Sequence, residues 1–482
     1  MTMTKNIHPK ILFLNINHRP DWTKEKTFVY YPLGLAYVMS ETARKGYDFD
    51  VIDLQIDPKT KEELNKILTE NEYDVVAFGA LSNAYYIVKP LIAEIKNALP
   101  HAIVVVGGSI ASSCTEILLN RTETDIAVMG DGEETFVEIL NKISRDESTD
   151  CIRGIAFKRN GSIINAKPRP PLKSLDELSI PNWDLLDVES YISSAKQYKN
   201  IRSFSYLSDI RPFFMFTQRG CPYRCTFCYN SLYHRYNPYR KHSKEYIIAM
   251  MKRLKAKYDV DFLWLVDELT FLSVENATPL IDALIEENIG VSFQATARVG
   301  FLKKGDGVFA TKLKKAGCIH LTYSMESGSP KILKAMNKKI NIKDYAVQKK
   351  ILDDAGIIST NSLVLGYPQE TEETIAETFQ VCYENDSYPS VGFLMPLPGS
   401  LMYSYALKKG YITDEEDYLL DMSDRQFLNI NMTQMSDERF LNLVKNHLKR
   451  IRDKLEIDLP DDQLICHTII EKDGNTISNK NE

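Results

Sequence analysis

The sequence predicts an α/β protein built from two consecutive α/β units and a short helical tail. Over residues 10–148, short apolar runs alternate with longer amphipathic runs, which is typical of a parallel sheet with helices on both faces. The same alternation resumes near residue 211 and contains six strand-like runs. Six βα units predict an incomplete (β/α)6 barrel, with ligands bound at the carboxyl ends of its strands.

In the first unit, glycines follow the predicted strands. They include Gly79, Gly107, Gly108 and Gly130. Ligands of such parallel sheets bind at the carboxyl ends of the strands. The predicted strands are Ile11–Ile16, Asp48–Asp53, Val75–Phe78, Ile103–Val106 and Ile126–Met129, and the predicted helices are Leu33–Lys45, Lys61–Leu68, Tyr86–Ala98 and Thr135–Ile143.

Residues 149–204 are expected to connect the two units. They open with a hairpin that turns at Asn160–Gly161 and continue into a proline-rich stretch. The barrel is expected over residues 205–410 and a small, mostly helical tail over 411–482. The predicted barrel strands are Phe213–Thr217, Phe262–Val266, Val291–Ala295, His320–Ser324, Thr360–Leu365 and Gly392–Met395.

Composition excludes several classes of protein. The 482 residues carry a formal charge of −6, so the overall charge gives no indication of nucleic acid as a partner. No run approaches the ~20 apolar residues that span a bilayer, and Met1–Lys10 lacks the apolar core of a signal peptide. We therefore expect a cytoplasmic protein. Three of its eight cysteines lie in one short segment, and clustered cysteines in such proteins more often bind metal than form disulfides.

That segment, residues 219–230, reads RGCPYRCTFCYN. Cys221, Cys225 and Cys228 have the spacing CxxxCxxC and follow the first predicted barrel strand. Three thiolates can bind three irons of a [4Fe–4S] cluster and leave the fourth iron open to a ligand. The alternatives are a zinc site and a buried cluster of cysteines, but structural zinc usually takes four protein ligands. His234 is the nearest candidate for a fourth ligand.

The cysteine motif, with Phe227 just before its last cysteine, resembles the radical S-adenosylmethionine (SAM) superfamily. Five further segments follow in the order of that family: VDELTF (266–271), ATARVGFL (295–302), SMESGSPKILKAMNK (324–338), SLVLGYPQET (362–371) and PLPGSLMY (396–403). The resemblance implies that the open iron binds SAM. It also implies that an electron from the cluster cleaves SAM to methionine and a 5′-deoxyadenosyl radical.

Three residues are expected to contact SAM. The resemblance assigns this role to Glu326, although an acid before the predicted helix Pro330–Met336 could instead cap that helix. Arg298 follows the third strand and could donate to the SAM carboxylate; a surface arginine is the alternative. Gly366 permits a close backbone approach to the adenine. Asp267 and Glu268 end the second strand and face either a ligand or a helix terminus.

The first unit resembles the cobalamin-binding domain that precedes many radical SAM barrels. The matching segments are residues 31–54, 104–112, 128–140 and 179–187. Gly107, Gly108 and Ser109 would form a floor beneath the flat corrin ring, beside the turn at Gly130. The acids Asp131, Glu133 and Glu134 suit the amino terminus of the following helix.

One cobalamin marker is absent from the sequence. No histidine lies in the Asp-x-His-x-x-Gly motif that supplies a ligand to cobalt in some cobalamin proteins, and His18 lacks the preceding acid. Many radical SAM relatives bind cobalamin without a protein ligand. The resemblance therefore still implies cobalamin, with no histidine bound to the cobalt.

Together these features predict a cobalamin-dependent radical SAM methyltransferase that acts on an unactivated carbon or phosphorus of a small molecule. No catalytic side chain is identified beyond the cofactor ligands. A flavodoxin or ferredoxin is expected to donate the electron. Two alternatives remain: a radical SAM cyclase, oxidase or rearrangement enzyme without methyl transfer, and a non-catalytic cobalamin or iron–sulfur carrier.

Overall fold

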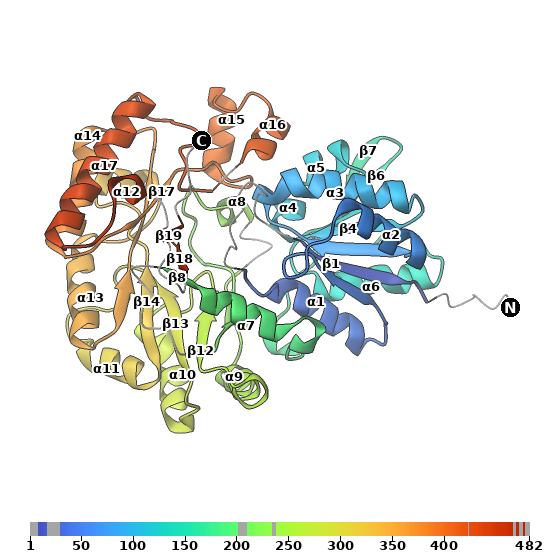
Figure 1. The fold of residues 1–482 in the computed structure, drawn as a ribbon, viewed down its shortest axis with the longest axis horizontal. Coiled ribbons are helices and arrows are strands. Elements are labelled where there is room, and N and C mark those ends of the chain that lie inside the picture. The colour runs from blue at the N-terminus through green and yellow to red at the C-terminus, as the bar shows by residue number, and fades with distance from the viewer. Residues whose placement is uncertain are drawn as a thin grey trace.

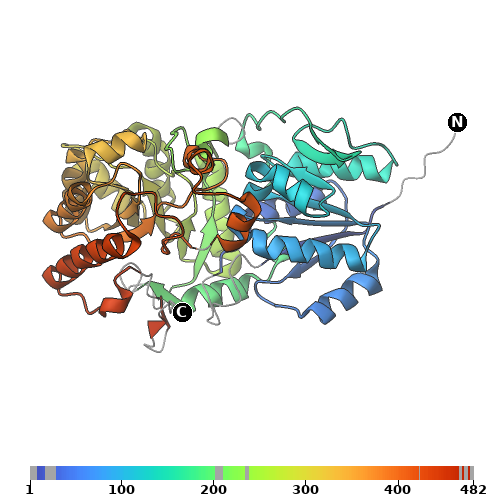
Figure 2. The same ribbon diagram turned by 90° about the horizontal axis from the view of Figure 1, so that it is seen from above.

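The computed structural model describes residues 8–16, 29–200, 210–233, 238–422, 424–465, 469–471 and 476–477. His18, His234 and Cys466 lie outside these residues. Two α/β units lie side by side, and the carboxyl-terminal elements extend along the second unit and reach the first (Figures 1 and 2). No helix in this part of the chain is both long enough and apolar enough to span a membrane.

The amino-terminal sheet confirms the predicted parallel alternation. Its order is β2-β1-β3-β4-β5-β6-β7, in which the first five strands are parallel. The strands are β1 Ile11–Asn15, β2 Asp50–Asp53, β3 Val75–Gly79, β4 Ile103–Gly107, β5 Ile126–Val128, β6 Ile155–Arg159 and β7 Ser162–Asn165. The helices are α1 Leu33–Arg44, α2 Lys61–Asn71, α3 Tyr85–Ala98, α4 Gly108–Ser113, α5 Thr115–Arg121 and α6 Glu133–Ser144, with the 3-10 turn η1 Ser82–Ala84.

Alternate residues of these strands enter two different cores, because successive side chains of a strand point to opposite faces. On β1, Phe13 packs in the core that includes α1 and α6. Its neighbour Leu14 packs in the core that includes α2, α3 and α5. The predicted hairpin turns at Asn160–Gly161, where both residues have positive φ, and its strand β6 pairs antiparallel with β5. The hairpin therefore extends the first sheet.

The connector contributes the 3-10 turns η2 Leu175–Glu177 and η3 Trp183–Leu185, helix α7 Val188–Gln197 and strand β8 Tyr198–Asn200. The barrel sheet that follows has the order β15-β14-β13-β12-β9. Its strands are β9 Pro212–Met215, β12 Phe262–Leu265, β13 Ser292–Ala297, β14 Cys318–Tyr323 and β15 Ile358–Thr360, and β16 Ser362–Leu365 pairs with β17 Ser390–Phe393 in a separate parallel pair.

The predicted strand Thr360–Leu365 is thus divided between two sheets at Asn361. The side-chain oxygen of Asn361 accepts from the backbone N–H of Met325 at 2.9 Å. Glu326 then bridges to Leu363 on the far side of the break. The division places Glu326 in the gap between the two sheets, at the carboxyl end of β14.

The remaining elements of the second half cover the barrel and continue beyond it. Two short strands flank the cysteine segment: β10 Gln218–Arg219 and β11 Arg240–Lys241. The helices are α8 Asn230–Tyr233, α9 Lys244–Tyr258, α10 Val274–Glu287, α11 Gly307–Lys315, α12 Pro330–Ala335, α13 Lys343–Asp354, α14 Glu372–Glu384 and α15 Leu401–Lys409. The tail adds α16 Glu415–Asp421, α17 Asp437–Lys454, the 3-10 turn η5 Asp461–Gln463 and the strands β18 Ile469–Glu471 and β19 Thr476–Ile477, so it is not wholly helical.

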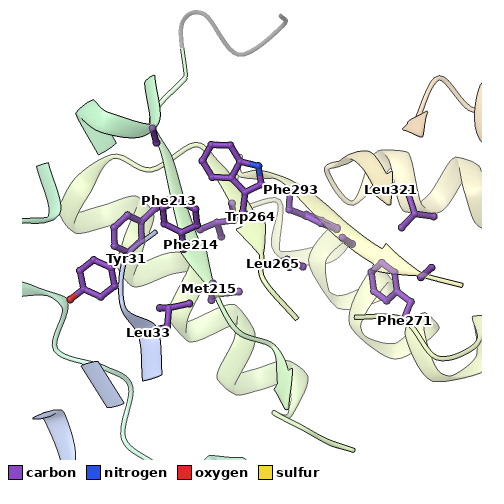
Figure 3. Packing of buried hydrophobic residues seen from close by; sticks show 14 of the residues in the cluster. Tyr31, Leu33, Phe213, Phe214, Met215, Trp264, Leu265, Phe271, Phe293 and Leu321 are labelled. Atoms are coloured by element: carbon purple, nitrogen blue, oxygen red, sulfur yellow. The ribbon is translucent and has the colours of Figure 1, made fainter. Parts of the chain in front are cut away.

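A shared hydrophobic core joins the two units. Tyr31, two residues before α1, packs on Phe213 of β9 (Figure 3), and their ring centroids are 4.9 Å apart. The Tyr31 hydroxyl also donates to the carbonyl of Trp183 in the connector at 2.8 Å. On the opposite side, Glu416 of α16 accepts from Tyr85 of α3 at 2.7 Å. Contacts beside α1 and contacts at α3 therefore both join the first unit to the rest of the chain.

Candidate functional site

A cavity of about 530 Å³ lies at the carboxyl ends of β1, β3, β4 and β5. Its mainly apolar wall comes from these strand ends and from the start of α1. Residues that follow β9 and β12 close it from the barrel side: Phe216, Gln218, Arg219, Val266 and Glu268. The predicted ligand edge of the first unit therefore faces the segment that leads into Cys221.

Glycines form part of the cavity wall, among them Gly79, Gly107, Gly108 and Gly130. A Cβ atom added at Gly79 would meet no heavy atom within 4 Å, so the chain leaves open space there. Gly108 is different, because its φ is +84° and an added Cβ would lie 2.4 Å from the carbonyl oxygen of Ala80. The backbone conformation and the nearby Ala80 carbonyl thus require glycine at position 108, whereas the absence of a side chain at Gly79 leaves room for a ligand.

Ser109 does not line the cavity. Its hydroxyl accepts from the backbone N–H of Ser82 at 3.2 Å and ties the start of α4 to the turn after β3. The apolar wall and glycine edge fit a flat macrocycle such as a corrin. The cavity-lining residues in the described ranges include no histidine, and His18, the candidate nearest to β1, lies outside those ranges.

The cysteine segment is held by the barrel on several sides. The backbone N–H of Thr226 donates to Met336 at 2.9 Å, and the Thr226 carbonyl accepts from Met402 at 3.1 Å. The Asn230 amide donates to the carbonyl of Cys221 at 3.0 Å. The N–H of Gly220 donates to Glu268 at 3.1 Å, so Glu268 contacts both the cavity and this segment.

Asp267 shapes the approach to the cysteines. It is buried, and its carboxylate accepts from the backbone and hydroxyl of Thr217 at 2.7 and 2.6 Å and from the N–H of Gln218 at 3.1 Å. Burial raises the pKa of Asp267 to about 6, although these hydrogen bonds oppose the shift. Asp267 therefore positions the backbone that precedes Cys221 and does not cap a helix.

No cysteine of the described residues takes part in a disulfide, and the three cysteines of the segment lie near one another. Cys225 is buried, and Cys221 and Cys228 are partly buried. Burial raises the pKa of Cys228 to about 12 and shifts the pKa of Cys221 in the same direction, whereas iron binding deprotonates a thiol. Within the described ranges, no three His, Cys, Asp or Glu side chains form a metal-ion site. The thiolates of a [4Fe–4S] cluster each bind a different iron and need not converge on one atom.

Arg298 lies against this segment. Its guanidinium is 3.7 Å from the centre of the Tyr223 ring, and its Nη1 atom is 3.9 Å from the sulfur of Cys225. Its Nη2 atom donates to the carbonyl of Lys338. Arg298 is therefore part of the cysteine site and not a surface arginine.

Glu326 is buried and pairs with Lys338, whose Nζ lies 2.9 Å from Oε1. The ammonium group also lies 6.0 Å from the centre of the Phe227 ring. Ser329 precedes α12 without a side-chain cap. The Glu326 carboxylate is thus directed to Lys338, at the cysteine segment.

Gly366 adopts a φ of +109° after β16. The N–H groups of Gly366 and Tyr367 both donate to the buried carboxylate of Glu370. Burial raises the pKa of Glu370 to about 7. Tyr367 in turn shares a hydrogen bond of 2.8 Å with Thr226, so this turn is linked to the cysteine segment.

Sequence reasoning did not single out Lys338, Glu370, Arg219 or Arg240. Lys338 is the last residue of the quoted segment 324–338, and Glu370 is the second-to-last residue of 362–371, so those motifs already contained them. Arg219 directly precedes the Gly–Cys pair, but its partners lie on another unit. Asp131 and Glu133 were expected to serve the dipole of α6, and the structure pairs both with Arg219.

The fold and site define a class: a parallel-sheet cofactor domain joined to a partial barrel that carries three clustered cysteines. Residues 24–140 match the B12 binding domain, and residues 215–382 match the radical SAM superfamily. The chain therefore belongs to the radical SAM enzymes that carry an amino-terminal B12-binding domain, and its cofactors are a [4Fe–4S] cluster, SAM and cobalamin.

Curated relatives and solved structures extend the comparison. An uncharacterized methyltransferase of Pyrococcus horikoshii is 28% identical over 402 residues, which is 83% of this chain and 82% of that protein. The anaerobic magnesium-protoporphyrin IX monomethyl ester cyclase of Rubrivivax gelatinosus is 23% identical over 85% of this chain and 72% of its own. The radical SAM methyltransferase TsrM of Kitasatospora setae, solved with cobalamin and a [4Fe–4S] cluster, has a TM-score of 0.65 at 17% identity, covering 84% of this chain and 78% of TsrM. This last likeness concerns the fold.

Proposed function

We propose that this enzyme transfers a methyl group to an unactivated carbon or phosphorus of a small molecule. The observation that carries the proposal is the position of the cavity. It is lined jointly by the glycine edge of the B12-binding domain, by Arg219, the first residue of the cysteine segment, and by Glu268, which accepts a hydrogen bond from Gly220 in that segment. Group transfer between two cofactors requires reacting centres that lie close together.

We infer that the chain's own residues bind and orient SAM beside Cys221, Cys225 and Cys228. Lys338 presents a buried ammonium group to an anionic ligand, and Glu326 presents a carboxylate to a cationic one. Arg298 holds the segment through Tyr223 and Cys225 and supplies a second positive charge. Phe227 offers an apolar face to the adenosine, and we assign a backbone contact with it to the turn at Gly366. When bound, the cluster supplies the electron that cleaves SAM.

A non-methylating radical reaction is the second candidate. The Rubrivivax gelatinosus relative is a cyclase, and a related arrangement of domains can therefore serve ring formation. The Pyrococcus horikoshii relative and TsrM both bear the name methyltransferase, which favours methyl transfer here. A carrier without catalysis would make no use of the buried charges of Glu326 and Lys338 beside the cysteines.

The products formed from methyl-labelled SAM distinguish these functions. The protein, loaded with cluster and hydroxocobalamin without oxygen, would be reduced with flavodoxin or ferredoxin, the donors we propose for a cytoplasmic enzyme, and mixed with a cell metabolite extract. Methyl transfer predicts both 5′-deoxyadenosine and label in a new small molecule. Deoxyadenosine with all label retained in methionine would support the cyclase or oxidase alternative. Intact SAM would support a carrier.

A further inference from the structure

Arg219, two residues before Cys221, inserts its side chain into the B12-binding domain. Its Nη1 atom lies 3.1 Å from Asp131, and its Nη2 atom lies 2.5 Å from Glu133. The guanidinium also lies 5.0 Å from the centre of the Tyr37 ring on α1. Three contacts from the other domain therefore hold a residue at the start of the cysteine segment.

Arg240, on the neighbouring strand β11, also forms an ion pair with Asp131. It directs both terminal nitrogens to Asp131, at 2.5 and 3.3 Å. Arg240 lies opposite Arg219 in the antiparallel pair of β10 and β11. The strand pair that leads into and follows the cysteine segment thus presents two arginines to one carboxylate.

This cluster has little access to solvent. The side chains of Arg219, Arg240, Asp131 and Glu133 are only 14, 9, 16 and 3% exposed. The arginines hold the pKa of Asp131 below its usual value, in spite of burial. Removal of one partner from a buried ion pair is strongly destabilising. The ion pairs among these four residues therefore fix their positions relative to one another.

The acids of the cluster are also part of the cavity. Asp131 and Glu133 flank Gly132 at the start of α6, and all three line the cavity together with Arg219. A ligand that packs against this wall therefore packs against the groups that hold the cysteine segment. Arg240 takes part in the cluster without being among the residues that line the cavity.

We propose that Arg219 and Arg240 are positioning residues that couple cobalamin in the cavity to the geometry of the cysteine segment. Through Asp131 and Glu133 they set the distance and orientation between the two cofactors. Cobalamin that packs against Asp131 and Glu133 thereby stabilises residues 217–229 through the two arginines. This inference depends on cobalamin occupying the cavity and not on which group the enzyme transfers.

Hydrogen exchange with and without cobalamin tests this coupling. Cluster-containing protein would be measured by mass spectrometry in the presence and absence of hydroxocobalamin. In the wild type, cobalamin should slow exchange in peptides that cover residues 217–229 and 238–241. In Arg240→Gln this protection should be lost while the iron content is kept, and cobalamin affinity should fall about 5- to 150-fold, the usual range of coupling between sites. Arg240→Lys keeps the positive charge beside Asp131, so it should restore most of the protection from exchange and most of the cobalamin affinity.

A second readout is the distance between the two metal centres. Pulsed electron paramagnetic resonance on protein with a reduced cluster and paramagnetic cobalt should give a narrow distance distribution in the wild type. The distribution should broaden in Arg240→Gln and Arg219→Gln. The control is Arg211→Gln, which removes a pair with Glu189 at the opposite end of β9.

Unchanged protection and an unchanged distance distribution in both glutamine variants would overturn the proposal. So would equal effects in the Arg211→Gln control. If Arg219→Gln does not fold, the comparison of Arg240→Gln with Arg240→Lys still tests the proposal by both measurements. A wild-type protein that binds no cobalamin would refute the inference together with the cobalamin site, whereas unmethylated products alone would refute only the proposed function.

Discussion

Lys338 Nζ lies 2.9 Å from Glu326 Oε1, and both side chains are buried. The pair lies where the barrel sheet divides at Asn361, and Glu326 adopts a φ of +65° there. An acid in a left-handed backbone conformation is uncommon, and such strain persists where the surrounding structure maintains it. The break in the sheet therefore places the buried Glu326–Lys338 ion pair beside the cysteine segment.

Lys338→Met should weaken both folding and SAM binding. Removal of one partner leaves a buried carboxylate without its counterion, which costs about 3–5 kcal/mol of stability. Loss of a charge-assisted contact should reduce SAM affinity by about 1.5–3 kcal/mol. Denaturant unfolding and equilibrium dialysis measure the two effects, with exposed Lys331→Met on α12 as the control. Reduced stability with wild-type SAM affinity would assign the pair a purely structural role.

Replacement of Cys221, Cys225 or Cys228 by alanine should abolish SAM cleavage. Three thiolates bind three irons of the cluster, and no spare ligand is available from this segment. Iron content and 5′-deoxyadenosine formation would be measured after anaerobic reconstitution. The matched control is Cys151→Ala, which changes an exposed thiol. A Cys221→Ala variant with full activity would disprove the ligand assignment.

Gly79→Leu should expel cobalamin and leave the cluster intact. The added side chain enters the open space at the end of β3, where a Cβ meets no atom within 4 Å. Gly307→Leu is the control, because its Cβ also meets nothing and the residue is exposed on the barrel. Absorption spectra after hydroxocobalamin loading report retention. Equal retention in the two variants would place the corrin elsewhere.

Gly108 is a poorer site for that experiment than sequence reasoning suggests. Sequence reasoning predicts that a bulky residue there would occupy the space of the ring. The structure shows instead that any Cβ would collide with the backbone of Ala80. Gly108→Ala should therefore disturb the turns after β3 and β4 even before cobalamin is added, which circular dichroism of the cofactor-free protein would reveal as a lower melting temperature.

Glu370→Gln should remove part of the pH dependence of stability. The pKa of Glu370 is about 7 in the folded protein, against 4.5 for the unperturbed group. The folded state binds the proton of Glu370 more tightly than the unfolded state does. Its contribution to the free energy of unfolding is therefore fully present below about pH 4.5 and is lost as the pH rises through 7. The difference corresponds to about 3 kcal/mol. Unfolding free energies at pH 5 and pH 8 should differ less in the variant.

Exposed Glu372→Gln is the control for this effect, since its carboxylate is on the surface beside Arg439. A residual slope of the same sign should remain in Glu370→Gln. Burial also raises the pKa of Asp267 to about 6. An identical pH dependence in wild type and Glu370→Gln would mean that Glu370 is ionised in the fold throughout this range.

The sequence predicted the two-unit fold because apolar runs and turn glycines are local features. Strand β3, for example, was visible as a run of valine and phenylalanine that ends at Gly79. The division at Asn361 was not visible, since residues 360–365 form one continuous strand-like run. The break depends on the contact of Asn361 with Met325, which arises only in the folded chain.

The cysteine ligands were predictable for the same reason, because their spacing is local and chemically specific. The partners of Arg219 were not, because they lie 88 and 86 residues away in the chain. Asp131 and Glu133 looked like residues that favour the amino terminus of a helix, which is a sufficient local explanation for acids at that position. Only the docking of β10 against α6 reveals their second role.

We propose that cobalamin and a SAM-cleaving cluster work in one chain, on either side of a shared cavity. Quantification of iron, cobalt and 5′-deoxyadenosine in one anaerobically reconstituted sample tests it most directly. We expect about four irons and a single cobalt per chain, with deoxyadenosine formed on reduction. In Gly79→Leu the cobalt should be lost and the iron kept. Wild-type protein that forms deoxyadenosine yet retains no cobalt would contradict the claim.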